Sequence, residues 1–285
     1  MRESSRAPIV DASGAFTTGN DDELAVLFAT LVLSAGAVVM EVFAQEKIVA
    51  RIKNDSSPVS DADERAEAQL LTDLTRLLPA LPIIAEESVA RGVVPAHRGA
   101  FLLVDALDGT REFIARRKEF TINVALVVDG APRAGAVYAP ALGELFFAGA
   151  DAYAVAAQPG FPLPSRGDWR RLHTRRAPAA LTALVSRSHL DDETLAFLRR
   201  HHITDSLQAG SSLKFCRLAE GRADVYPRFG PTMEWDIAAG DAILRAAGGA
   251  VLTPQGGAFG YGKTAQAYRN GAFVAWGDPA VATIS

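Results

Sequence analysis

Apolar residues recur at helical spacing along several stretches of the chain. The run 24–40 contains no charged residue, and Asp21 or Asp22 just before it can serve as the N-cap of a helix. Within 61–78 the apolar positions fall three or four residues apart, which predicts a second helix with one buried face. Shorter helices are predicted over 191–200, 212–220 and 235–247, the last ended by two glycines.

Short runs of β-branched and apolar residues predict strands between these helices. Thr121–Val128 is followed by Asp129-Gly130, a pair that favours a tight hairpin turn. Two apolar runs end in carboxylates, because 81–85 stops at Glu86 and 101–104 stops at Asp105. The other predicted strands are 134–138, 144–148, 181–186, 223–226, 250–253 and 271–276.

The order of these elements predicts two halves. Hairpin-connected strands dominate the first, and strands alternate with helices in the second, so an α+β half precedes an α/β half. Between them, 158–178 holds four prolines, two glycines and five arginines with little periodicity, as a loop at a domain junction would. We expect a loose tail over 1–20, an N-terminal domain over 21–156 with most metal ligands, and a C-terminal domain over 157–285.

Composition narrows the class of protein. Hydrophobic residues make up 49% and charged residues 22%, a globular balance rather than a disordered one. The net charge of −4 argues against nucleic-acid binding, and the single Cys216 excludes a disulfide framework or a zinc site built from cysteines. Acids rather than Lys or Arg flank the run 24–40, so we expect a buried helix and no transmembrane span or signal peptide.

The most informative stretch follows the strand that ends near position 104. Asp105 and Asp108 can face one point in space, and hard divalent cations bind such rigidly placed oxygen ligands. Gly109 and Thr110 would present backbone N–H groups to an anion at a helix start. Cation ligands beside an anion cradle suggest a metal-assisted phosphoryl site, and a turn with solvated acids is the alternative.

Further acids stand at the ends of other predicted elements. Asp61 and Asp63 open a helix, Glu86 ends a strand, and Asp236 opens a helix whose Gly240 permits close backbone approach. Taken singly, each has an ordinary explanation as an N-cap, a surface charge or a first-turn acid. Together they supply the five or six carboxylates that a two-metal site requires.

These segments resemble the inositol monophosphatase superfamily of lithium-sensitive, magnesium-dependent phosphatases. Asp105–Phe113 is similar to its DPxDGTxxF signature, with Ala106 in place of the usual proline; 235–240 is similar to its WDxxAG signature, and 85–88 to a third acidic segment. The resemblance covers about 22–280. It implies a layered αβαβα sandwich of the inositol monophosphatase and fructose-1,6-bisphosphatase type.

Longer stretches resemble one branch of this superfamily, the CysQ-type 3′(2′),5′-bisphosphate nucleotidases. They are 118–125, 185–189, 210–216 and 219–236. This resemblance implies a Mg²⁺-dependent hydrolysis of 3′-phosphoadenosine 5′-phosphate to AMP and phosphate, within sulfur metabolism. It also implies a monomer or homodimer, in the cytoplasm or loosely held on the cytoplasmic side of the inner membrane.

The resemblance implies specific roles at the metal site. One Mg²⁺ would be held by Glu86, Asp105 and the Leu107 carbonyl, and a second by Asp105, Asp108 and Asp236, in a site for two or three ions. Glu86, Asp63 and Thr110 are the implied catalytic residues, with Thr110 orienting the attacking water and Asp63 accepting from Thr110.

On the substrate side, Arg228 stands where the inositol-specific branch has a glutamate, and a cation suits a second phosphate. The expected substrate contacts are Gly109, Thr110, Ser211, Ser212, Lys214, Arg228 and Asp236. A solvated Lys214 and an Arg228 paired with a nearby acid are the alternatives. For the whole chain, the alternatives are an inositol or sugar monophosphatase and a non-catalytic nucleotide or metal sensor.

Overall fold

A seven-stranded sheet carries the first half of the molecule. In the computed structural model, which describes residues 21–53, 58–186 and 191–282, its strands run in the order β3-β4-β5-β6-β7-β8-β9. β3 and β4 are parallel, and every later pair is antiparallel. The strands are β3 (Ile83–Ala85), β4 (Ala100–Asp108), β5 (Thr121–Val128), β6 (Ala131–Ala139), β7 (Glu144–Ala148), β8 (Ala152–Ala156) and β9 (Arg170–Arg171).

A five-stranded mixed sheet carries the second half, in the order β11-β10-β12-β16-β14. β10 is parallel to both of its neighbours, whereas β16 is antiparallel to β12 and β14. These strands are β10 (Thr182–Ser186), β11 (Asp205–Ala209), β12 (Val225–Arg228), β14 (Ala250–Leu252) and β16 (Phe273–Trp276). Two short ribbons join β1 (Ala50–Ile52) to β2 (Pro58–Ser60) and β13 (Thr232–Met233) to β15 (Arg269–Asn270).

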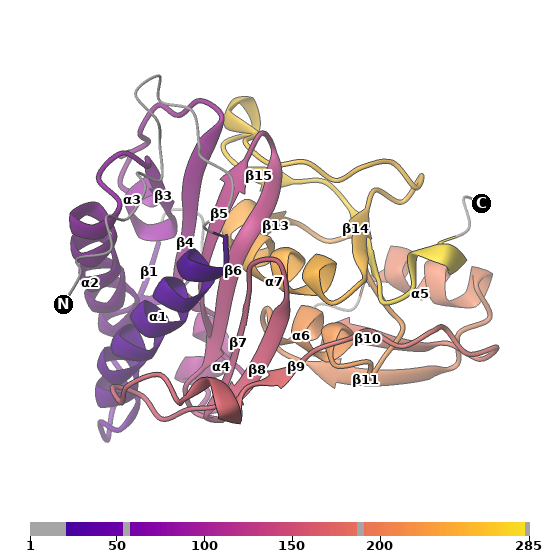
Figure 1. The fold of residues 1–285 in the computed structure, drawn as a ribbon, viewed down its shortest axis with the longest axis horizontal. Helices are drawn as coiled ribbons and strands as arrows, with labels where there is room; N and C mark the ends of the chain where they lie inside the picture. Colours follow the sequence, from indigo (N-terminus) through magenta and orange to yellow (C-terminus); the bar gives the residue numbers. More distant parts are fainter. Residues whose placement is uncertain (1–20, 54–57, 187–190, 283–285) are drawn as a thin grey trace.

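Helices form the layers around and between the two sheets (Figure 1). α1 (Asp21–Phe43) and α2 (Asp61–Leu77) cover the outer face of the seven-stranded sheet, and α6 (Leu213–Ala219) and α7 (Glu234–Ala246) lie between the sheets. α5 (Asp192–Arg200) packs on the far side of the second sheet. Short helices α3 (Glu86–Ala90) and α4 (Thr110–Ile114) follow β3 and β4, and the 3₁₀ turns are η1 (Arg166–Asp168), η2 (Thr264–Gln266) and η3 (Pro279–Val281). This order of layers confirms the predicted αβαβα sandwich.

Close backbone approach holds the middle layer against the first sheet. A Cβ added at Gly135 of β6 would lie 2.9 Å from the Cα of Ala239 in α7. A Cβ at Gly240 would lie 2.6 Å from the ring of Phe215 in α6. Glycine at both positions therefore lets α7, which carries Asp236, sit close to both the sheet and α6.

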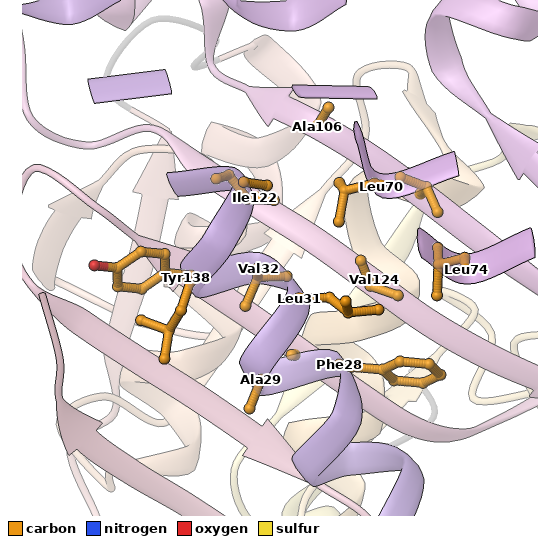
Figure 2. Packing of buried hydrophobic residues seen from close by; sticks show 14 of the residues in the cluster. Phe28, Ala29, Leu31, Val32, Leu70, Leu74, Ala106, Ile122, Val124 and Tyr138 are labelled. Carbon is orange, nitrogen blue, oxygen red and sulfur yellow. The ribbon is translucent and has the colours of Figure 1, made fainter. Parts of the chain in front are cut away.

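The apolar run 24–40 lies within α1 and faces the core. Phe28 and Val32 are fully buried, and they pack with Leu70 of α2 and Val124 of β5 (Figure 2). By length and composition α1 could cross a membrane, but half of its most apolar window is buried inside the molecule. The burial of this face accounts for the uncharged run, as expected for a core helix.

Several elements differ from the sequence-based predictions. Asp21 and Asp22 both lie within α1, so neither is its N-cap, and the expected tail over 1–20 lies outside the described residues. Ser60, rather than Asp61, caps α2. The predicted loop 158–178 contributes β9 to the first sheet, so that sheet extends past the expected boundary at 156/157; the division into two domains stays a prediction.

Candidate active site

The end of β4 brings two carboxylates to one place. The predicted strand end at Asp105 is wrong, because pairing with β5 continues to Asp108 through a register shift between these residues. A bulge re-aims side chains at such a point. Asp105 is 2% exposed, and one of its oxygens accepts from the backbone N–H of Leu107 at 3.0 Å.

The turn after β4 depends on a glycine. Gly109 has φ +94°, a left-handed conformation that favours glycine, and it precedes the first residue of α4. A Cβ at this position would also lie 2.4 Å from the hydroxyl oxygen of Ser211. Gly109 therefore allows the chain to turn while Ser211 approaches from the second half of the molecule.

Two further elements complete a cluster of carboxylates. Glu86 opens α3 instead of ending a strand, and Asp236 is the third residue of α7. Each offers an oxygen that lies within 4.8 Å of the other and of an Asp105 oxygen. Asp236 also accepts from the backbone N–H of Met233 at 2.7 Å, which fixes its carboxylate at the helix start. Three oxygen donors so close together suit a hard divalent cation.

The electrostatics of the cluster favour a cation. Burial raises the pKa of Asp105 well above its usual range, and the neighbouring Glu86 and Asp108 raise it further. Burial likewise raises the pKa of Asp236, with Asp108 adding to the effect. For Asp108, burial raises the pKa to about 6 although Lys214 opposes the shift. Like charges held together out of water need a positive partner.

Asp63 and Thr110 lie beside the cluster as a hydrogen-bonded pair. Thr110 Oγ1 donates to Asp63 Oδ1 at 2.9 Å, while Asp63 Oδ2 accepts from the N–H and the hydroxyl of Ser60. Burial raises the pKa of Asp63, and the Ser60 hydrogen bonds oppose that shift. A carboxylate fixed in this way can orient the threonine hydroxyl and accept a proton from it.

A cavity of about 320 Å³ opens over the carboxylates. Its lining includes Glu86, Asp105, Asp108, Asp236, Gly109 and Thr110, together with Ser211, Lys214, Tyr226 and Arg228. Lys214 is buried, its Nζ donates to the Ser211 carbonyl at 2.8 Å, and burial lowers its pKa to about 8. Arg228 is half-buried and donates to the Pro231 carbonyl at 3.2 Å. The cavity lining thus contains both carboxylates and two cationic side chains.

Ser212 departs from the expectation that it contacts substrate. It does not belong to the described lining of the cavity, and only 1% of its surface is exposed. Its hydroxyl contacts Asn123, Asp108 and the Asp236 carbonyl instead.

Sequence reasoning missed three residues that contact the acids. Lys53 Nζ donates to Glu86 at 2.7 Å and to Glu87 at 2.5 Å, and no pattern marked this lysine. Glu67 is buried and accepts from the backbone N–H of Glu87, and its place on the apolar face of α2 was a usable signal. Asn123 is a polar residue inside the apolar strand β5, which was also a signal.

The chain matches a family model over most of its length. The model of the inositol monophosphatase family matches residues 20–281. The 3′(2′),5′-bisphosphate nucleotidase CysQ of Salmonella typhimurium is 43% identical over 235 residues, which cover 81% of this chain and 91% of that protein. The CysQ of Escherichia coli K12 is 41% identical over 229 residues, covering 79% and 89% respectively.

Solved structures agree with the sequence comparisons. CysQ from Bacteroides thetaiotaomicron, described as a bacterial member of the inositol monophosphatase family, superposes with a TM-score of 0.74 at 34% identity. That match covers 91% of this chain and 98% of the other. An IMPase from Thermotoga maritima has a TM-score of 0.71 at 22% identity, over 90% and 92% of the two chains, and supports the shared fold.

Proposed function

The chain belongs to the inositol monophosphatase family, and on this premise we propose that it is a 3′(2′),5′-bisphosphate nucleotidase. It hydrolyses 3′-phosphoadenosine 5′-phosphate to AMP and phosphate, with Mg²⁺ as cofactor. The observation that carries the proposal is a cavity lined both by a carboxylate cluster and by Lys214 and Arg228, in a chain about 40% identical to CysQ nucleotidases.

The donor set fits Mg²⁺. Glu86, Asp105 and Asp236 offer carboxylate oxygens within 4.8 Å of one another, and Asp108 with the Leu107 carbonyl borders the same cavity. We propose that these five residues hold two or three Mg²⁺ ions. When bound, the ions polarise the phosphoryl oxygens and the attacking water.

Asp63, Thr110 and Glu86 act on the attacking water. The Thr110 hydroxyl donates a hydrogen bond to Asp63 Oδ1, which leaves its lone pairs to accept a hydrogen bond from the water. Asp63 then draws the proton through Thr110, and the raised pKa of this buried carboxylate makes it a better acceptor. The backbone N–H groups of Gly109 and Thr110 bind the phosphate oxygens, next to Asp236.

Lys214 and Arg228 recognise the second phosphate of the nucleotide. Both line the cavity together with the carboxylates, and cationic side chains suit a second phosphate better than a neutral polyol. Ser211 also lines the cavity and supplies a hydroxyl to the nucleotide.

The cytoplasm is the compartment that fits this activity. The packing of α1 supports this proposal, because its apolar face is buried in the hydrophobic core of the molecule.

The test is phosphate release from 3′-phosphoadenosine 5′-phosphate and from inositol 1-phosphate, side by side, with Mg²⁺ and with EDTA. We expect rapid, EDTA-sensitive release from the nucleotide and slow release from the inositol ester. Preference for the inositol ester would keep the metal site and overturn the role of Arg228. No release from either compound would refute the proposed activity.

A further inference from the structure

A buried hydroxyl connects the Asp108 carboxylate with the backbone of Asp236, and these two residues come from different layers of the fold. Ser212 immediately precedes α6, and its Oγ donates to the backbone carbonyl of Asp236 at 2.5 Å. The same oxygen lies 3.2 Å from Asp108 Oδ2. Asp108 ends β4 of the first sheet, whereas Asp236 belongs to α7, so Ser212 touches both sides of the boundary between the layers.

Asn123 anchors this hydroxyl to the first sheet. Its Nδ2 donates to Ser212 Oγ at 2.9 Å, and the residue is fully buried. On β5, Asn123 pairs directly with Asp105 of β4. Asn123 is therefore the strand partner of one acid of the cluster, and its hydrogen bond reaches the serine that contacts the Asp108 carboxylate and the Asp236 carbonyl.

We infer that Asn123 and Ser212 form a positioning pair that holds Asp108 and the start of α7 at the separation needed for divalent-cation binding. The inference rests on the proposed function and assigns Ser212 to the metal side of the site instead of the substrate side. Neither residue lines the cavity, so neither touches substrate.

The hydrogen-bonding capacity of a serine explains the choice of residue. A hydroxyl has one proton to donate and two lone pairs to accept with. The Asn123 amide donates to one lone pair of the Ser212 hydroxyl. The hydroxyl proton of Ser212 is shared between the Asp236 carbonyl and the Asp108 carboxylate. A neutral donor at this point can hold a carboxylate in place without cancelling the negative charge that attracts the cation.

Ser211 provides the contrast within the same segment. Its hydroxyl donates to the backbone carbonyls of Asp108 and Glu119, and the residue lines the cavity. Two adjacent serines thus have different surroundings, one open to a ligand and one enclosed by protein groups.

The experiment is calorimetric titration of the metal-free protein with Mg²⁺, together with steady-state kinetics. Ser212→Ala and the volume-conserving Ser212→Cys should weaken Mg²⁺ binding by roughly 10–100-fold, the loss typical of groups that orient metal ligands. The KM for the nucleotide at saturating Mg²⁺ should change less than about threefold. Asn123→Ala should act through the same pair, so the double variant should bind Mg²⁺ no more weakly than the worse single variant.

Two controls separate positioning from other effects. Ser211→Ala should show the opposite pattern, a raised KM with Mg²⁺ binding close to that of the unaltered protein. Ile203→Ala, a buried change near α5 and away from the cavity, controls for lost stability and should leave Mg²⁺ binding unchanged.

A Ser212→Cys protein that folds, binds Mg²⁺ normally and has a raised nucleotide KM would overturn the inference. The titration does not depend on which phosphate ester is hydrolysed. If the unaltered protein binds Mg²⁺ but releases no phosphate from the nucleotide, the proposed function fails while the calorimetric comparison still decides the role of Ser212.

Discussion

Asp105 is a buried carboxylate with three neighbours of its own charge. Glu86, Asp108 and Asp236 all raise its pKa in addition to the effect of burial. Asp105→Asn keeps the shape and an acceptor for the Leu107 N–H, but removes the charge shared by both proposed metal ions. We expect phosphate release to fall roughly 10²–10³-fold, with an unchanged circular dichroism spectrum. Turnover near that of the unaltered protein at ordinary Mg²⁺ would refute the assignment of the site.

Arg228 tests how the substrate is recognised. If its guanidinium binds the second phosphate, Arg228→Ala should raise the KM for a 3′,5′-bisphosphate about 10–100-fold, the effect of a hydrogen-bonded charge worth about 1.5–3 kcal/mol. A nucleoside 3′-monophosphate should be affected much less. Arg228→Lys should be intermediate, because lysine keeps the charge but loses the planar fork. Equal losses on both substrates would argue against this role.

The lowered pKa of Lys214 predicts that substrate binding depends on pH. Burial lowers its pKa to about 8, so the ammonium loses its charge as the pH rises through that value. The KM for the bisphosphate should therefore increase between pH 7 and 9 at saturating Mg²⁺. In Lys214→Arg the cation persists, and the KM should stay flat. The same slope in both proteins would show that another group titrates.

The free energy of unfolding of the metal-free protein should also depend on pH through Lys214. It should increase with pH, whereas substrate binding weakens. Because the folded pKa of Lys214 lies below its ordinary value of 10.5, the charged form costs stability below pH 8. That cost disappears as the pH rises from about 8 toward 10.5.

At the level of single residues, the carboxylates could be predicted because each stands at the start or the end of a predicted element. Asp105 and Asp236 were identifiable in this way, and the structure brings them together with Glu86. The partners of these acids were harder to predict. Lys53 reaches Glu86 from a segment without periodicity, and no local pattern encodes a contact across thirty-three positions.

Among the elements, α3 depends on a charged side chain inside the core. Glu67 of α2 accepts from the Glu87 N–H and the Ser88 hydroxyl, both at 2.7 Å, and so holds the helix that begins with Glu86. Glu67→Gln replaces one acceptor by a donor that faces another donor. We expect the free energy of unfolding to fall by about 1–3 kcal/mol in urea titrations.

A matched change on the same helix serves as the control for Glu67. Asp73 lies nearer the helix end and pairs with the exposed Arg76 at 3.1 Å. Asp73→Asn should change the unfolding free energy by less than about 0.5 kcal/mol. Equal losses for the two variants would mean that Glu67 contributes only as a surface charge does.

Element prediction succeeded for the longer elements with a clear apolar pattern and missed several short strands, among them the mostly buried β8. The long helices α1 and α7 and the central strand β5 carry clear apolar patterns. β11 has four exposed residues and pairs only with β10 at the sheet edge, so it leaves almost no hydrophobic signal. β9 is two residues long, and its pairing with β8 is a long-range contact that the composition of 158–178 conceals.

For the whole molecule, the proposed site lies at the boundary between the layers. Glu86 and Asp105 belong to the first sheet and its short helix, and Asp236 to the helix layer between the sheets. A cation bound by all three would connect these layers in the folded state only. Free Mg²⁺ at one hundred times its Kd should then stabilise the protein by about 2.7 kcal/mol.

Thermal unfolding measures this stabilisation directly. The melting temperature should rise by several degrees from EDTA to saturating MgCl₂, and NaCl of equal ionic strength should not reproduce the rise. Asp105→Asn should lose most of the response. An equal Mg²⁺ response in that variant would place the ion elsewhere.

The position of α1 in the chain has a consequence for synthesis on the ribosome. The helix ends at Phe43, but the strands it covers, β6 and β7, begin only at Ala131 and Glu144. At 5–20 residues per second, about 5–20 s pass before its partners are translated. During that interval a 23-residue apolar helix has no sheet to pack on. We therefore expect the nascent chain to bind chaperones that shield hydrophobic segments. We expect this binding to end when the hairpin of β6 and β7 emerges from the ribosome.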